Sequence, residues 1–284
     1  KQNFINLKLK LLCCRYWSLD LWDCHDMTFP FWRIYWNKNE GGEIRHQEEI
    51  YKMDPNHIYI IAPFTSFSSR FTKKHVYNSG IHVLGHHLTK SYQETDIEEN
   101  SLLHFFTHFN LGVPFDNVYP GIYKIELTNH LKERLQYLTQ RLKIENTDFK
   151  LTFNLKLQSF IKEAISNIGP ELWKAINIDD RVLKVLRYIE NNINTKLSNA
   201  DLSEIVNMAP NSFARLFKEE MNITLHNFIQ KRKIARACDL FEHTDKTIEV
   251  VTFDLGFSDR YHFSRVFKNV TGLTPAVYKS GKYT

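Results

Sequence analysis

The six residues FARLFK (213–218) recur 50 residues later as FSRVFK (263–268). The matching register continues beyond the repeat, because Ile223-Thr224 follows the first copy where Leu273-Thr274 follows the second. Self-similarity at a fixed spacing indicates one structural unit used twice. In each copy the two phenylalanines, four residues apart, fall on one face of a helix, and the Arg and Lys fall on the opposite face. The repeat therefore predicts two amphipathic helices, each with one apolar and one polar face.

A short apolar segment and a turn precede each copy. Residues 201–206 lead into Asn207-Met208, and residues 248–254 lead into Leu255-Gly256-Phe257. Helix, tight turn and second helix is the helix-turn-helix arrangement. Glycine adopts left-handed backbone freely, and asparagine is among the few other residues that do so. We expect two helix-turn-helix units, at about 198–221 and 247–271.

The polar faces of the two repeated helices carry side chains that suit DNA recognition. A major groove about 12 Å wide admits a helix, in which Arg pairs with guanine and Asn with adenine. The predicted base-reading residues are Arg265, Tyr261, Ser264, Arg260, Arg215, Asn211 and Ser212. Lys268 and Lys218 are predicted to contact phosphate. One such helix alone is more often a solvated surface helix, but two copies in matching register favour double-stranded DNA as the partner.

Between the copies, Thr224 is placed to cap a long helix over residues 225–244, which we expect to act as a rigid spacer. Arg236 on this helix is the candidate for a buried structural ion pair. Residues 180–284 hold 16 Lys and Arg against 12 Asp and Glu, a net charge of +4. Because the whole chain carries +5, most of its basic excess lies in this region.

The first half of the chain has a different pattern. From about Phe29 to Phe109 it contains short β-rich runs separated by turn clusters, namely FWRIYW, EIRHQ, EIYKM, HIYIIAPF and IHVLGHHL. This pattern favours a sandwich or small barrel. Leucines at 127, 131, 135, 138 and 142 then predict an amphipathic helix, and a second helix follows over 157–168 and ends at Gly169-Pro170. These two helices either pair with a second subunit or cover the β-domain.

Length and composition limit the remaining possibilities. A chain of 284 residues suits two domains. Four cysteines, at positions 13, 14, 24 and 238, form no CxxC pair, so we expect reduced thiols. No apolar run reaches the length of a membrane span and the start lacks the features of a leader peptide. The sequence thus indicates a cytoplasmic protein without a membrane partner.

The C-terminal residues resemble the AraC family of bacterial transcription regulators. The stretch GFSDRYHFSRVFKNVTGLTPAVYK (256–279) closely matches the family's second unit, and residues 203–233 match its more variable first unit. The resemblance implies a seven-helix domain whose two recognition helices enter successive major grooves. The first unit departs from the pattern, because Asn207 stands where Gly is usual, Ala209 replaces a capping Ser, and Ala214 has no polar reach.

The N-terminal half resembles, more weakly, the cupin-type effector domain of such regulators, through DPNHIYIIAPFTSF (54–67). The expected fold is thus a jelly-roll or cupin-like barrel followed by amphipathic helices, and an all-α domain with two helix-turn-helix units joined by a long helix. The expected regions are an effector domain (1–121), a helical dimerisation or linker region (122–175) and a DNA-binding domain (176–284). We expect a homodimeric transcription regulator, more specifically an activator acting with RNA polymerase, controlled by a small-molecule effector.

Other chemistry is less well supported. Histidines at 82, 86, 87, 104 and 108 do not have the spacing of a helical His pair or of a metal-binding cupin, so we expect no metal, and no cofactor or catalytic residue is predicted. A DNA-repair alkyl transferase with an AraC-like domain would need a reactive cysteine, and no nucleophile motif accompanies Cys13, Cys14 or Cys24. An architectural DNA binder without an effector would be distinguished by DNA affinity that no small molecule changes.

Overall fold

The computed structural model describes residues 7–73, 80–88, 101–116, 118–144, 151–170, 172–173 and 178–280. The chain divides into two compact units. The first contains Leu9–Asn110 and Pro120–Gly169, and the second contains Leu111–Tyr119 and Pro170–Gly281. Residues 111–119, which fall inside the predicted region 1–121, therefore group with the C-terminal helices. The predicted boundaries at residues 1, 175/176 and 284 lie outside the described residues, and the three-region division stays a prediction.

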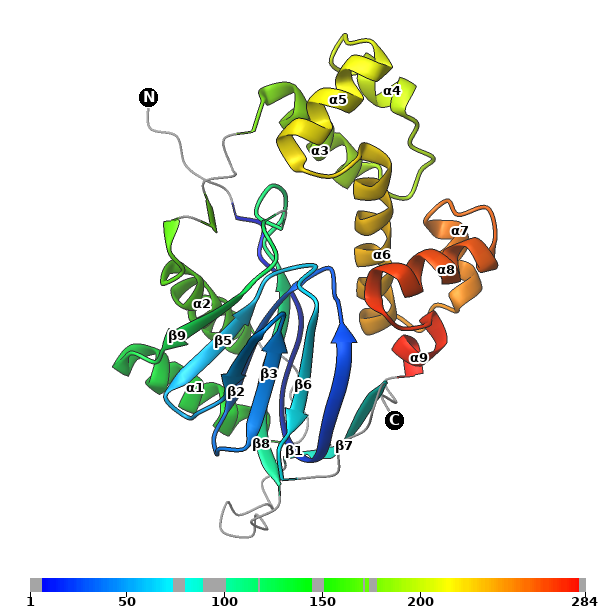
Figure 1. Cartoon of the computed structure of the whole chain (residues 1–284). Helices are drawn as coiled ribbons and strands as arrows, with labels where there is room; N and C mark the ends of the chain where they lie inside the picture. The colour runs from blue at the N-terminus through cyan, green and yellow to red at the C-terminus, as the bar shows by residue number, and fades with distance from the viewer. Residues whose placement is uncertain are drawn as a thin grey trace. The chain divides into compact units, whose positions relative to one another are not determined.

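The first unit is built on one curled antiparallel sheet (Figure 1). Its strands are β1 (Lys10–Met27), β2 (Trp32–Asn37), β3 (Gly42–His46), β4 (Glu49–Lys52), β5 (His57–Ile61), β6 (Phe67–Phe71), β7 (Ile81–His87), β8 (Leu102–Asn110) and β9 (Ile122–Glu126). The spatial order is β4-β3-β6-β1-β8-β2-β5-β9, and β7 also pairs with β1. This curled sheet confirms the predicted cupin-like fold of the N-terminal half.

The longest strand, β1, lies outside the predicted β-rich region of 29–109. Its 18 residues pair with β8 over the first half and with β7 and β6 over the second. Buried positions alternate with exposed or half-buried ones from Leu12 to Trp17, as a strand requires. The segment contains no Gly, Pro or Asn to delimit it, which is why the turn-based prediction missed it.

Both predicted helices of the first unit are present, as α1 (Asn129–Leu142) and α2 (Leu151–Ser166), and they pack on each other. The region predicted as helical from residue 122 begins instead with β9, whose residues alternate in burial and pair with β5. The leucine stripe of α1 is buried within the protomer, and Phe160 of α2 meets Phe105 of β8 with ring centroids 6.0 Å apart. These helices therefore cover the sheet, and the stripe is not available for a subunit contact.

The second unit contains the C-terminal helices. They are α3 (Asp180–Asn191), α4 (Asn199–Glu204), α5 (Pro210–Met221), α6 (Leu225–His243), α7 (Ile248–Asp254), α8 (Arg260–Thr271) and α9 (Pro275–Ser280). Two predicted helix caps are present. The hydroxyl of Ser198 accepts a hydrogen bond from the backbone N–H of Asp201, and the hydroxyl of Thr224 accepts one from the backbone N–H of Asn227. Two helix-turn-helix units joined by a long helix are confirmed.

Helix α6 lies between the two helix-turn-helix units (Figure 1). Aromatic contacts near both of its ends join it to them. Near its start, Phe228 meets Phe217 of α5 with ring centroids 5.5 Å apart. Near its end, Phe241 meets Phe267 of α8 at 5.9 Å and Phe263 at 6.4 Å. Each recognition helix is thus anchored by its repeated phenylalanines to the same rigid helix, which is about 28 Å long at 1.5 Å per residue.

The buried ion pair of α6 is made by Arg232, and the prediction that Arg236 makes it is wrong. Arg236 pairs with Asp239 on its own helix and stays partly exposed. Arg232 is buried, and its Nε lies 2.6 Å from a carboxylate oxygen of Glu190 on α3. Its Nη1 also lies 3.6 Å from buried Asp116, in the segment between β8 and β9. Arg232 makes the buried ion pair because it lies on the face of α6 that is turned toward α3.

We predict that Phe267→Ala lowers the free energy of unfolding by about 3 to 5 kcal/mol, because it removes a buried ring that contacts two other rings on α6 and α9. The matched control is Phe253→Ala on α7. The Phe253 side chain is 67% exposed, so its removal should change the free energy of unfolding little. Denaturant titration of both variants measures the difference. Equal losses would show that the aromatic anchoring does not stabilise the domain.

Candidate nucleic-acid interface

The second helix-turn-helix unit has a well-defined turn and helix start. Gly256 has a φ of +65°, as predicted, and a Cβ added there would lie 3.3 Å from the Nζ of Lys233. Asp259 caps α8 by accepting the backbone N–H of His262 at 2.7 Å. That hydrogen bond lowers the pKa of the Asp259 carboxyl and keeps it ionised. The sequence analysis did not identify this cap, although an Asp directly before an apolar helical pattern is a usual start signal.

The first unit reaches the same arrangement with weaker local signals. Asn207 has a φ of +52° and takes the left-handed conformation in the turn, as predicted. Ala209 precedes α5 without a side-chain cap, and Pro210 occupies the first turn, where its missing N–H is not needed. The helix ends are also equivalent, because Asn222 ends α5 and Gly272 ends α8, both in left-handed conformation.

Most of the residues predicted to contact DNA lie on the faces of α5 and α8 opposite the phenylalanine anchors, whereas Arg260, three residues before Phe263, lies on the phenylalanine side at the start of α8. Arg265 and Lys268 of α8 and Arg215 and Lys218 of α5 are exposed, and the Tyr261 side chain is 89% exposed. Asn211, Ser212 and Arg260 are also exposed, whereas Ser264 is half-buried. The fold therefore brings Tyr261, Arg265 and Lys268 onto one exposed surface of α8, and Asn211, Arg215 and Lys218 onto the equivalent surface of α5.

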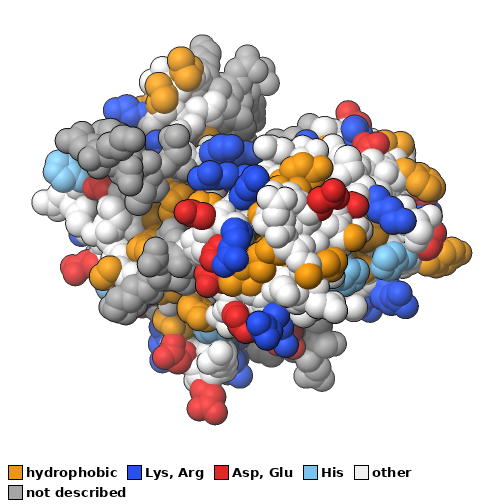
Figure 2. Space-filling model, turned by 90° about the horizontal axis from the view of Figure 1, so that it is seen from above, with side chains coloured by type: hydrophobic (Ala, Val, Ile, Leu, Met, Phe, Trp, Pro, Cys, Tyr) orange, Lys and Arg blue, Asp and Glu red, His pale blue; other side chains and the backbone are white. Residues whose placement is uncertain are grey.

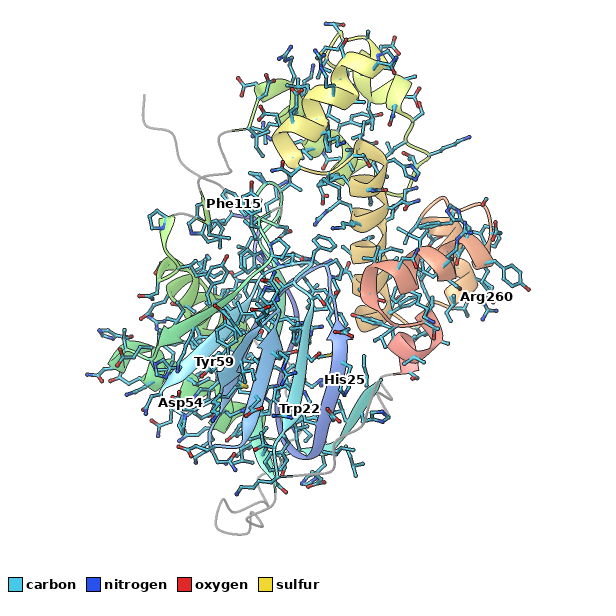
Figure 3. The ribbon with its side chains drawn as sticks, in the orientation of Figure 1. Trp22, His25, Asp54, Tyr59, Phe115 and Arg260 are labelled. Atoms are coloured by element: carbon cyan, nitrogen blue, oxygen red, sulfur yellow. The ribbon has the colours of Figure 1, made fainter. Side chains whose placement is uncertain are left out.

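Neighbouring acidic groups distinguish the arginines from one another. Arg260, at the outer edge of the α7–α8 pair in Figure 3, pairs with Glu249 of α7. The Nε of Arg215 lies 3.8 Å from Glu219 one turn along α5. Arg265 has no ion pair or hydrogen bond from its side chain to any residue that the structure describes. Its guanidinium needs no rearrangement before it contacts a base, whereas Arg260 must first leave Glu249.

Lysines of α6 differ from those of the recognition helices. Lys233 is buried, donates to the backbone carbonyl of Thr195 at 3.1 Å and lies 5.6 Å from the centre of the Phe257 ring. It therefore supports the turn of the second unit, and burial lowers its pKa. On the face drawn in Figure 2, Lys and Arg side chains are interspersed with acidic and apolar ones.

Buried cysteines and histidines of the described residues have pKa values shifted away from those of reactive or charged groups. None of the four cysteines forms a disulfide, and burial raises the pKa of Cys14 and raises that of Cys24 to about 12, opposite to what a nucleophilic thiolate requires. Burial lowers the pKa of His104 to about 3. Among the described residues, no group of three His, Cys, Asp or Glu is arranged to hold a metal ion. No helix in the described ranges has the length and apolar character needed to cross a membrane.

Comparison with known proteins identifies the C-terminal region. Residues 202–281 match the model of a helix-turn-helix domain family. The arabinose operon regulatory protein of Escherichia coli is 29% identical over 105 residues, which are 37% of this chain and 36% of that protein. The probable transcriptional regulator LumQ of Photobacterium leiognathi is 28% identical over 123 residues, which are 43% and 48% of the two chains. The chain thus spans less than half the length of each of these relatives.

The whole fold is similar to that of ToxT from Vibrio cholerae. The two structures align with a TM-score of 0.58 over 95% of this chain and 98% of that one, at 12% sequence identity. ToxT has also been solved with a bound unsaturated fatty acid, in a structure that aligns with a TM-score of 0.56. At this identity the likeness concerns the fold. The sequence matches show that the C-terminal region is a helix-turn-helix domain similar to those of transcriptional regulators, and the fold of both units is similar to that of ToxT.

Proposed function

We propose that this protein is a sequence-specific transcription regulator that binds double-stranded DNA through both helix-turn-helix units. The observation that carries the proposal is the pair of equivalent helices, α5 and α8, anchored by Phe217 and Phe267 on one spacer helix. Both turn Arg and Lys away from that anchor toward solvent. The base readers are Arg265, Tyr261, Ser264, Arg260, Arg215, Asn211 and Ser212, and the phosphate contacts are Lys268 and Lys218.

The two units contribute unequally in this proposal. The second unit has an ionised cap at Asp259 and an Arg265 whose side chain pairs with none of the described residues, so its helix is preorganised for a specific base contact. The first unit has no cap at Ala209, a short side chain at Ala214 and an arginine that lies near Glu219. We therefore assign the larger part of sequence discrimination to α8.

The N-terminal unit is the proposed regulatory part. Curled sheets of this kind hold small ligands, and the similarly folded ToxT has been solved with a fatty acid. We propose that a small-molecule effector binds this unit and that the protein acts in the cytoplasm as an activator with RNA polymerase. A run-off transcription assay with purified polymerase separates activation from repression. Because the leucine stripe of α1 is buried, a homodimer would have to use another surface.

Arg265→Ala should weaken binding to the specific site by about 1 to 3 kcal/mol and weaken binding to random DNA much less. Lys268→Ala should weaken both kinds of DNA alike and lower the slope of log K against log salt by about 0.9, because it removes a phosphate contact. Titrations at several salt concentrations measure both effects. The control is Arg181→Ala on α3, an exposed arginine that pairs with Asp179 at 2.7 Å and that should leave both affinities unchanged. Equal losses on specific and random DNA for Arg265→Ala would show a backbone contact instead of base reading.

The dimer is tested by sedimentation of the full chain with and without its DNA site. We expect two chains on one operator, as is usual for operator-binding helix-turn-helix proteins. A single chain per site at every protein concentration would rule the dimer out and would leave the DNA-binding proposal in place.

A further inference from the structure

One face of the curled sheet carries a polar cluster within an aromatic surrounding. Arg33 and Tyr35 alternate along β2, and Arg33 lies opposite His108 of β8 in the strand register. The intervening residues of the same strands, such as Trp32 and Phe105, point to the other face, where Phe105 meets Phe160 of α2. The face away from α2 is called the inner face below.

Arg33 is a buried cation that has no acidic partner among the residues that the structure describes. It is 3% exposed, and its guanidinium carbon lies 3.4 Å from the centre of the Phe29 ring. Its hydrogen bond within the described residues goes from Nη1 to the hydroxyl of Tyr35 at 2.9 Å, and its buried Nε has no partner there. No carboxylate of the described part of the chain forms an ion pair with it. A buried charge is costly unless it is paired.

Arg232, which is also buried, shows how carboxylates stabilise a buried arginine in this protein. Arg232 is held by two hydrogen bonds to Glu190 and lies 3.6 Å from Asp116. Arg33 has aromatic rings in those places, namely Phe29, Phe31, Tyr35 and Phe67, with ring centroids between 3.4 and 5.9 Å from its guanidinium carbon. Aromatic faces attract a cation but leave its N–H groups without acceptors. Of these two buried arginines, Arg232 has carboxylate partners and Arg33 has none among the described residues.

Neighbouring polar atoms on the inner face are also unsatisfied. The Nε2 of His108 and the Nε1 of Trp17 are buried without hydrogen bonds in the described residues. Trp17 meets Phe106, the residue between the two histidines of β8, with ring centroids 6.2 Å apart. Trp22, labelled in Figure 3, packs on His104 at 4.6 Å. Burial lowers the pKa of both His104 and His108, so both rings are neutral near pH 7. These two histidines therefore add no positive charge beside Arg33.

We propose that Arg33 binds the carboxylate of a small organic acid, whose apolar body packs on the aromatic rings of the inner face. The Nε edge of a guanidinium pairs with a carboxylate through two parallel hydrogen bonds, and that edge is the free one here. Its two parallel donors match the two oxygens of one carboxylate group, and the rings around it suit an apolar ligand body. This inference rests on the proposed effector domain and gives the chemical class of its effector.

The test compares acids with their neutral amides on the full chain. Benzoate, phenylacetate and octanoate are each paired with the corresponding amide, and melting temperature and calorimetric affinity are measured at pH 7 for the wild type, Arg33→Gln and Arg33→Lys. We expect at least one acid to raise the melting temperature where its amide does not, because ligand binding to the folded state stabilises it. Arg33→Gln should weaken that acid at least tenfold, and Arg33→Lys, which keeps the charge without the fork, should weaken it less.

The matched control is Arg70→Gln, because Arg70 lies on the same sheet and is already paired with Glu43 at 2.6 Å. It should bind the acid as the wild type does. Binding of benzoate or phenylacetate would indicate a ring acid, and binding of octanoate a fatty acid. If Arg33→Gln does not fold, the acid-amide comparison on the wild type and Arg33→Lys decides.

Two results would overturn the inference. The first is that no acid stabilises the wild type at 10 mM, roughly a hundred times the dissociation constant of a 0.1 mM ligand. The second is equal acid affinity in the wild type and Arg33→Gln. In either case, intact binding of the wild type to its DNA site would show that the regulator proposal still holds. If the folded wild type bound no DNA at all, that result would instead contradict the regulator proposal itself.

Discussion

The packing of phenylalanine rings against α6 determines what the rest of the second unit can do. Phe217 on Phe228, and Phe263 and Phe267 on Phe241, fix how each recognition helix is rotated about its own axis. Large rings in edge-on contact allow few alternative orientations. Because anchor and polar face lie on opposite sides of one helix, fixing the rings also fixes the direction of Arg265 and its counterpart Arg215. The spacing of the two polar faces then follows from the length of α6.

A second constraint ties this spacer helix to its surroundings. Arg232 joins α6 to Glu190 of α3 and to Asp116, which lies in the chain between β8 and β9. Asp116 also accepts the backbone N–H groups of Leu111 and Gly112, so this segment is held at its own turn as well. The strands on either side of the segment belong to the sheet that carries Arg33. The chain therefore connects the proposed effector-binding sheet directly to the charge cluster that holds the spacer helix.

The C-terminal fold could be predicted in detail because its signals are local and appear twice. The left-handed turns at Asn207 and Gly256 and the cap at Thr224 follow from neighbouring residues alone. The N-terminal half was harder to predict, because β1 contains no Gly, Pro or Asn and pairs with strands distant in sequence. Periodicity showed that α1 has an apolar face but not whether the sheet or a second subunit covers it. Long-range packing also decides which arginine of α6 forms the buried ion pair, Arg232 or Arg236. It likewise decides that Arg33 is surrounded by aromatic rings, and residue spacing does not encode either outcome.

Hydroxyl-radical footprinting of one chain on its DNA site tests the central claim, that both recognition helices bind DNA as arms of one rigid spacer. We expect protection in two adjacent major grooves on one side of the duplex, with centres about 10 to 10.5 base pairs apart, roughly 34 Å. Protection per chain should remain in both grooves when the site is shortened to a single binding unit. Protection of one groove alone would show that only α8 binds DNA and that α5 is a structural element.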